Sequence, residues 1–236
     1  MTEEDIVIHQ LIFAAPKPGM TEHEFQQYWL NVHAVEYASK IPQIRKYLID
    51  TRIPFWPGEG EPLWSGVAEI WLRDEREQLE SLQTPEFLEG ARMDEPRWAA
   101  FWRTVVLDTD AHEVVAGPEL ASATGVKLIV LVKRKEGVPL AEFRSRSLGA
   151  HADLVRRVPG LRRYLQCHVR DGAYGIGEAV LDAAYLLSFD SRDDLAAALA
   201  SAEFAKAEAD MESFVEPRYV HRLVTTEHWI IGPESR

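Results

Sequence analysis

The stretch that decides the fold is residues 21–47, TEHEFQQYWLNVHAVEYASKIPQIRKY. Its aromatic and apolar side chains recur at the three- and four-residue spacing of one helical face: Phe25, Tyr28, Trp29 and Val32. His33 falls on the same face. Thr21 followed by Glu24 predicts a capping box at the start of this helix. We therefore expect a helix over about residues 22–40 that turns His33 toward aromatic side chains.

The composition limits what this helix can belong to. The chain has 236 residues, of which 46% are hydrophobic and 27% are charged, as in an ordinary globular protein. The net charge of -12 disfavours nucleic acid and anionic membranes as partners, because their phosphate groups would be repelled. The longest apolar runs, such as residues 128–132, are far shorter than a membrane span, and the first residues are acidic where a signal peptide is basic. We expect a cytoplasmic protein.

The cysteine content excludes some kinds of site. Cys167 is the only cysteine, so neither an intrachain disulfide nor a four-thiolate metal site can form. The histidines also lack the short spacings typical of metal ligands, and we predict no metal site.

The chain repeats its plan once. Equivalent residues of the two halves lie 118 positions apart near the start of the plan and 117 apart later on: Phe25 and Phe143, His33 and His151, Pro42 and Pro159, Tyr47 and Tyr164. An almost constant offset of this kind indicates an internal duplication. We predict an N-terminal domain over residues 1–117 and a C-terminal domain over 118–236, with a linker at about 117–125.

Each half reads as strand, helix, two strands, helix and strand. The expected strands cover residues 6–13, 44–53, 63–72 and 104–115, and then 126–132, 161–170, 178–189 and 220–231. This order is the ferredoxin-like β-α-β-β-α-β plan, an antiparallel sheet with helices on one face. The predicted fold class is therefore α+β.

A four-stranded sheet of this kind leaves its second face uncovered. Two such sheets can close into one eight-stranded barrel with the helices outside, and covalent linkage keeps the partner sheet available. Two independent domains on a flexible linker are the competing arrangement. Residues 126–132 contain scarcely any polar side chain, which indicates burial on both faces and favours the closed barrel.

The helical stretch also carries a family pattern. A strand, a Lys-Pro-Gly turn, F-x-x-Y-W-x-x-x-H-A and then P-x-[IL]-x-x-Y resemble the EthD family of the dimeric α+β barrel superfamily, here as a tandem pair. The first copy has Phe25, Tyr28, Trp29, His33, Ala34, Pro42, Ile44 and Tyr47. The second copy has Phe143, Arg146, Ser147, His151, Ala152, Pro159, Leu161 and Tyr164. It departs from the pattern at Arg146 and Ser147.

The resemblance implies a class of function. Similar proteins include cofactor-free monooxygenases, polyketide cyclases and decarboxylases, muconolactone isomerases, haem-handling enzymes and members without an assigned activity. They share an apolar pocket between the sheet and the helices. The resemblance thus implies a cofactor-independent lyase or isomerase of secondary metabolism or aromatic and xenobiotic degradation, acting on a hydrophobic, carbonyl-bearing or aromatic small molecule. A haem-binding protein, a noncatalytic ligand-binding or stress protein, and a homodimer as the assembly remain open.

His33 is the best candidate for the chemistry. An imidazole among aromatic side chains can transfer a proton near neutral pH, and Tyr28 and Tyr47 carry hydroxyl groups that could orient a carbonyl or phenolate. The alternative is a structural histidine that only packs and forms a hydrogen bond. For haem, the strand residues His112 and His228 could each supply the axial ligand.

Further residues are predicted to contact the substrate. His9 lies in a strand with apolar neighbours, and the loop after the second strand is aromatic. The predicted substrate-binding residues are His9, Trp29, Phe55, Trp56, Trp64 and His151. We expect the first half to hold the working pocket because its Tyr-Trp pair is intact; both halves acting on one ligand is the alternative.

Overall fold

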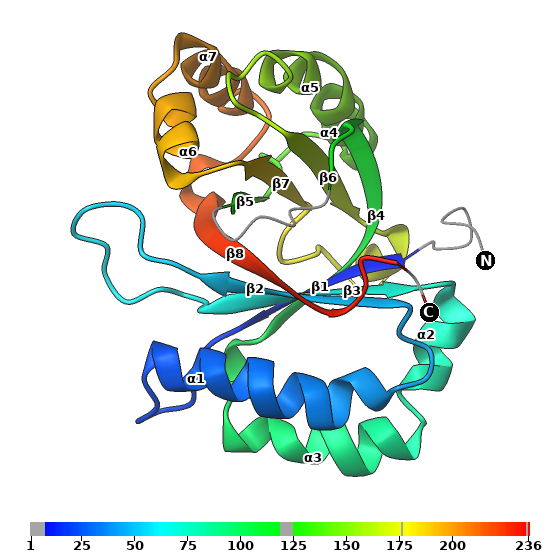
Figure 1. Ribbon diagram of the computed structural model, residues 1–236. Coiled ribbons are helices and arrows are strands. Elements are labelled where there is room, and N and C mark those ends of the chain that lie inside the picture. Colours follow the sequence, from blue (N-terminus) through cyan, green and yellow to red (C-terminus); the bar gives the residue numbers. More distant parts are fainter. Residues whose placement is uncertain (1–7, 119–124, 176, 235) are drawn as a thin grey trace. The chain divides into compact units, whose positions relative to one another are not determined.

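The computed structural model describes residues 8–118, 125–175, 177–234 and 236 (Figure 1). The chain divides into two compact units. The first contains residues 1–108 and 226–236, and the second contains residues 109–225. Most of the predicted linker, residues 119–124, lies outside the described residues.

The first unit follows the predicted order of elements. Its strands are β1 (Ile8–Ala14), β2 (Lys46–Arg52), β3 (Gly66–Leu72) and the start of β4 (Val105–Val115). Its first helix is α1 (Glu22–Tyr28), which continues as a π-helix (Trp29–Tyr37) and a 3-10 turn (Ala38–Lys40). The later helical segments are α2 (Glu75–Ser81), a π-helical turn (Glu86–Ala91), α3 (Arg92–Asp94) and 3-10 turns at Glu95–Arg97 and Phe101–Arg103. In Figure 1, α1 and α3 cover one face of the sheet.

The second unit repeats this order. Its strands are β5 (Val126–Val132), β6 (Arg163–Val169), β7 (Ala183–Phe189) and β8 (His221–Ile231), of which the last part belongs to the first unit. Its helices are α4 (Leu140–Arg146), a π-helical turn (Ser147–His151), α5 (Ala152–Val155), α6 (Arg192–Leu199) and α7 (Ala202–Met211), with 3-10 turns at Asp171–Tyr174 and Pro217–Tyr219.

The strands form one antiparallel sheet that closes on itself. Their hydrogen-bonding order is β1-β3-β2-β8-β5-β7-β6-β4, and β4 returns to β1. The strands β4 and β8 each run through both compact units: residues 109–115 pair with β6, and residues 221–225 pair with β5. Every residue of β5 is buried, as its apolar sequence predicts. The predicted fold class, an eight-stranded α+β barrel built from two ferredoxin-like repeats, is confirmed.

The long helix begins where the sequence predicts. Thr21 accepts a hydrogen bond from the Glu24 amide (3.2 Å), and the Glu24 carboxylate accepts one from the Thr21 amide (2.8 Å), which completes a capping box. The helix then widens into the π-helix of residues 29–37. Such i to i+5 segments are rare and occur frequently at functional sites. The equivalent segment of the second unit, residues 147–151, is also π-helical.

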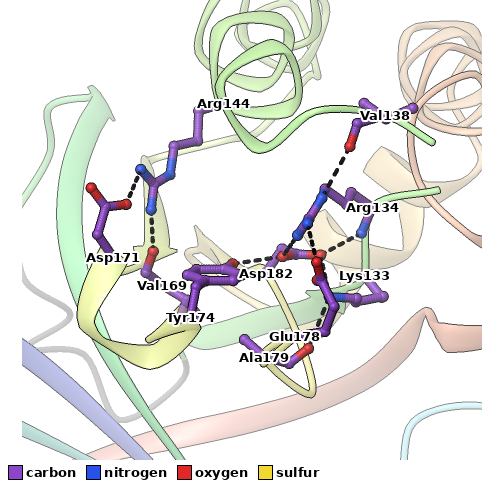
Figure 2. A network of polar contacts seen from close by, with 10 residues as sticks. All are labelled: Lys133, Arg134, Val138, Arg144, Val169, Asp171, Tyr174, Glu178, Ala179 and Asp182. Atoms are coloured by element: carbon purple, nitrogen blue, oxygen red, sulfur yellow. Dashed lines mark hydrogen bonds and ion pairs between the residues drawn. The ribbon is translucent and has the colours of Figure 1, made fainter. Parts of the chain in front are cut away.

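A buried carboxylate holds the long β6–β7 connection of the second unit (Figure 2). Asp182 is fully buried and accepts hydrogen bonds from the Arg134 amide (2.7 Å) and the Tyr174 hydroxyl (2.6 Å). The Arg134 guanidinium also contacts this carboxylate, and the Lys133 ammonium lies 3.1 Å from it. Because a buried charge is tolerated only when it is paired, this network ties the end of β5 to the connection before β7.

Candidate active site

The first unit contains a cavity of about 550 Å³ between its sheet and its helices. Ile12, Ala14, Ala68 and Ile70 line the sheet side. Trp29, His33 and Trp98 contribute from the helical side, and Tyr47 contributes from β2. This volume is in the range of small-molecule sites, which are typically apolar with a few polar groups. The site can therefore bind a hydrophobic molecule against a small number of polar atoms.

His33 is fixed in this cavity by a buried carboxylate. Its Nδ1 lies 3.0 Å from Oδ2 of Asp94, which is 1% exposed, and its ring packs 4.6 Å from the Trp98 ring. An ionised carboxylate only accepts hydrogen bonds, so this contact places the proton of the neutral imidazole on Nδ1. The lone pair of Nε2 is then available to a bound molecule.

Burial sets the charge of this histidine. Removal from water lowers the pKa of His33, and the hydrogen bond and charge of Asp94 oppose that shift but do not cancel it. The imidazole is consequently neutral at pH 7, which is the form that can accept a proton. Asp94 would stabilise the imidazolium formed by that transfer.

Asp94 is the residue that the sequence analysis missed. It is itself held by Tyr28, whose hydroxyl donates a hydrogen bond to Oδ1 (2.8 Å), and by Arg97, whose guanidinium lies 3.5 Å from the same oxygen. Tyr28 does not line this cavity, and its contact there is with Asp94, which it positions. The signal was available in the duplication, since Asp94 and Asp210 are 116 positions apart and accompany His33 and His151.

Tyr47 offers a hydrogen-bond donor to the same cavity. The Trp29 indole Nε1 donates a hydrogen bond to the Tyr47 oxygen (3.2 Å), which leaves the hydroxyl proton to be donated elsewhere. Burial raises the pKa of Tyr47 far above neutral pH, so the hydroxyl stays protonated. Trp29 therefore orients Tyr47 as a donor toward a ligand oxygen.

His9 was predicted to bind the substrate, but it lies on the face of the sheet that points away from the cavity. Gln10, Ile12 and Ala14 line the cavity, and strand alternation turns His9 away from it. There the His9 Nε2 lies 2.6 Å from Glu69, and the ring stacks on Trp71 at 4.4 Å. His9 is thus not in reach of a molecule in the cavity.

The predicted loop aromatics also lie outside the cavity lining. The backbone amides of Phe55 and Trp56 donate hydrogen bonds to the Glu59 carboxylate, at 3.0 and 2.6 Å. Trp64 donates to the carbonyl of Arg103 (3.0 Å) and packs against Phe13. These three aromatic residues stabilise the β2–β3 connection and its neighbours.

The second unit keeps the histidine–aspartate pair but has different side chains around it. His151 Nδ1 lies 3.2 Å from Asp210, and Arg146 replaces the tyrosine that holds the first carboxylate. Strand register places Tyr185 where the first unit has Ala68. Tyr185 is 2% exposed and its hydroxyl lies 2.6 Å from Ser147, the residue that replaces Trp29. The large side chain thus stands on the strand in the second unit, and on the helix in the first unit, where Trp29 lines the cavity.

Two other groups of side chains lie outside the cavity and carry metal-ligating atoms. Within the described residues, Asp50, Glu69 and Glu227 place carboxylate oxygens within 4.8 Å of one another, on strands of the first unit. Of the strand histidines suggested for haem, His228 Nε2 lies 2.9 Å from the Thr51 hydroxyl and His112 packs against His168. Neither histidine lines the cavity.

The EthD domain model matches the chain twice, over residues 17–101 and 135–218. The chain belongs to the EthD family. The two EthD domains coincide with the two repeats, and His33 and His151 lie at equivalent places within them. No curated protein has a sequence that matches the chain.

Solved structures share the fold of this tandem EthD protein at low identity. An anthrone oxidase-like protein is 10% identical, covers 97% of this chain and 94% of its own, and has a TM-score of 0.66. A protein of Fusobacterium nucleatum, provisionally described as a monooxygenase, is 8% identical with 98% and 96% coverage and a TM-score of 0.62. An EthD family protein of Bacillus halodurans is 23% identical, covering 44% of this chain and 100% of its own, with a TM-score of 0.38.

The first two likenesses show the fold of the EthD protein and leave its reaction to be argued from the site. The described part of the chain has no helix long and apolar enough to cross a membrane. The homodimer predicted from the sequence stays a prediction.

Proposed function

We propose that this EthD protein is an enzyme that moves a proton on a hydrophobic, carbonyl-bearing small molecule without a cofactor. The observation that carries the proposal is a neutral imidazole held by a buried carboxylate and facing a cavity that also receives the Tyr47 hydroxyl. An enzyme of the lyase or isomerase type needs these groups: a base near neutral pH, a donor for a developing oxyanion, and exclusion of water.

The chemical step uses three side chains. His33 Nε2 takes a proton from the carbon beside the carbonyl, and the electron pair of the broken C–H bond moves onto the carbonyl oxygen. Tyr47 donates a hydrogen bond to that oxygen, while Asp94 stabilises the imidazolium. In deuterium oxide the imidazolium proton is replaced by a solvent deuteron, and its delivery to the same carbon gives exchange. Delivery to another carbon gives isomerisation. The same enolate leads to cyclisation or dehydration, according to the substrate. In decarboxylation the enolate forms instead by loss of carbon dioxide from a β-keto acid, and the protonated His33 then delivers a proton to its carbon.

Deuterium exchange tests this proposal before the substrate is known. The protein is incubated in deuterium oxide with a panel of hydrophobic ketones and 1,3-diketones, and deuterium gained at carbon is measured by mass spectrometry. We expect exchange above the buffer rate for at least one compound. The rate should be constant near pH 7 and should fall only below pH 6.5, because burial lowers the pKa of His33 and protonation abolishes the base. An acid limb above pH 6.5 would contradict His33 as the base.

Filling the cavity should weaken ligand binding. Ala68→Tyr introduces the side chain that the second unit carries at the equivalent register, as Tyr185. We expect binding of 1-naphthol, measured by titration calorimetry, to weaken by at least about 10-fold, since the cavity volume is lost. Ala68→Ser is the matched control and should bind as the natural protein does. Unchanged binding by a folded Ala68→Tyr protein would place the ligand elsewhere.

Haem is the alternative cofactor, and the cavity fits it poorly. His33 has the arrangement of an axial ligand, with its second nitrogen held by a carboxylate. The two propionates of haem need cationic partners, however, and Arg92, the cationic side chain in the lining, is already paired with Glu95 at 2.9 Å. Asp108 adds a further negative charge to the lining. We therefore derive no step through haem; a Soret band after haem titration that is lost in His33→Gln would contradict this view.

A noncatalytic ligand-binding or stress protein is the third possible function. It predicts the same binding of hydrophobic molecules to the cavity. It differs in predicting no deuterium exchange above the buffer rate with any compound that binds. Binding and exchange measured on the same panel therefore separate the two functions.

A further inference from the structure

The sheet side of the cavity carries a polar pair. The Gln10 side-chain amide donates a hydrogen bond to Oδ1 of Asp108 (2.8 Å), joining β1 to β4, and both residues line the cavity. Both side chains are partly buried. Their remaining acceptors are Oδ2 of Asp108 and the Gln10 carbonyl oxygen, because one carboxylate oxygen already accepts the Gln10 amide.

The fold does not require this pair. The equivalent positions of the second repeat, 118 and 116 residues later, are Leu128 and Val224. They face each other in the register of β5 and β8, and both are fully buried. Two aliphatic side chains can therefore occupy the equivalent positions of the sheet. The polar pair occurs in the repeat that contains the cavity, and the apolar pair occurs in the repeat that has Tyr185 in place of Ala68.

We propose that Gln10 and Asp108 form a subsite that selects ligands bearing a hydroxyl group. This proposal rests on the proposed function and names the substrate class more closely: a neutral, largely apolar molecule with an alcohol or phenol. A hydroxyl can donate to the carboxylate oxygen, and such charge-assisted hydrogen bonds are roughly twice as strong as neutral ones. An anionic carboxylate ligand is disfavoured, because Asp108 would repel it.

Two matched probes test the subsite by binding alone. The probes are 1-naphthol and 1-methoxynaphthalene, which share the aromatic body and differ in the hydroxyl proton. We expect the natural protein to bind 1-naphthol about 10-fold more tightly, as one charge-assisted hydrogen bond allows. In the double variant Gln10→Leu with Asp108→Val, the preference should fall to about 1, and affinity for 1-methoxynaphthalene should stay within about 2-fold. Circular dichroism checks that the variant is folded.

Two further variants keep the test decisive. Asp108→Asn retains the shape of the pair and removes its charge, so the preference should fall to about 3-fold; it replaces the double variant if that protein does not fold. His33→Gln should keep the full preference, because the hydroxyl is assigned to the sheet side. Equal binding of both probes by the natural protein, or loss of the preference in His33→Gln, overturns the subsite and leaves the proton-transfer proposal standing. Binding of neither probe overturns the cavity as a ligand site, and with it both proposals.

Discussion

The substitution His33→Gln is expected to lower deuterium exchange by about 10² to 10⁴-fold, the usual contribution of a general base. Glutamine keeps the polarity and much of the volume, so the cavity and the fold should remain. Asp94→Asn should also lower the rate, because the asparagine amide can donate to Nδ1 and so favour the tautomer with its proton on Nε2. The measurement is the initial rate of deuterium gain at saturating substrate.

The second repeat supplies the control for this result. Asp210→Asn makes the same chemical change beside His151, whose ring packs 5.6 Å from the buried Tyr185 ring. It should leave the exchange rate within about 2-fold of the natural protein. Equal losses from Asp94→Asn and Asp210→Asn would mean that both repeats act in the reaction, and a fully active His33→Gln protein would end the proton-transfer proposal.

Among the substitutions proposed for the second unit, Asp182→Asn is expected to cause the largest loss in the free energy of unfolding. The substitution leaves the Arg134 guanidinium and the Lys133 ammonium without the buried carboxylate that neutralises them, and their side chains are only 12% and 18% exposed. Breaking a buried ion pair typically costs about 3 to 5 kcal/mol. We expect about 3 kcal/mol less free energy of unfolding, because Glu178 also contacts both cations. Denaturation in urea measures this change.

Glu178→Gln is the matched control in the same network. Glu178 is 65% exposed, so its pairs with Lys133 and Arg134 are screened by water. The loss of unfolding free energy should be much smaller than that caused by Asp182→Asn. A similar loss from both substitutions would show that burial of Asp182 is not what makes this network important.

Much of the fold could be predicted from the sequence because two independent signals agreed. The helical spacing of Phe25, Trp29 and His33 predicted the buried face of the first helix, and the repeat at His151 predicted a second copy of the same element. The apolar sequence of residues 126–132 predicted a strand buried on both faces, which the closed barrel requires. At these positions the spacing of apolar residues along the chain agrees with their burial in the barrel.

The site was predictable only in part, because partners come from packing between elements. The pattern placed His33 and Trp29 on one face, and both line the cavity. It could not pair His33 with Asp94, which is 61 residues away and reaches it only after the second helical stretch folds back. It also grouped His9 with the substrate-binding residues, because alternation along a strand fixes which residues share a face and does not say which face meets the helices. The equivalence of Tyr185 in the second unit with Ala68 in the first likewise becomes visible only from strand register.

Covalent joining of the two repeats removes a constraint on how the protein can evolve. In an assembly of two identical chains, every substitution appears at both sites, so enlarging one side chain would close both. Here the two positions are encoded separately: one keeps Ala68 and the other has Tyr185. Symmetry is thereby broken inside a single polypeptide, and one copy is free to serve as scaffold while the other specialises.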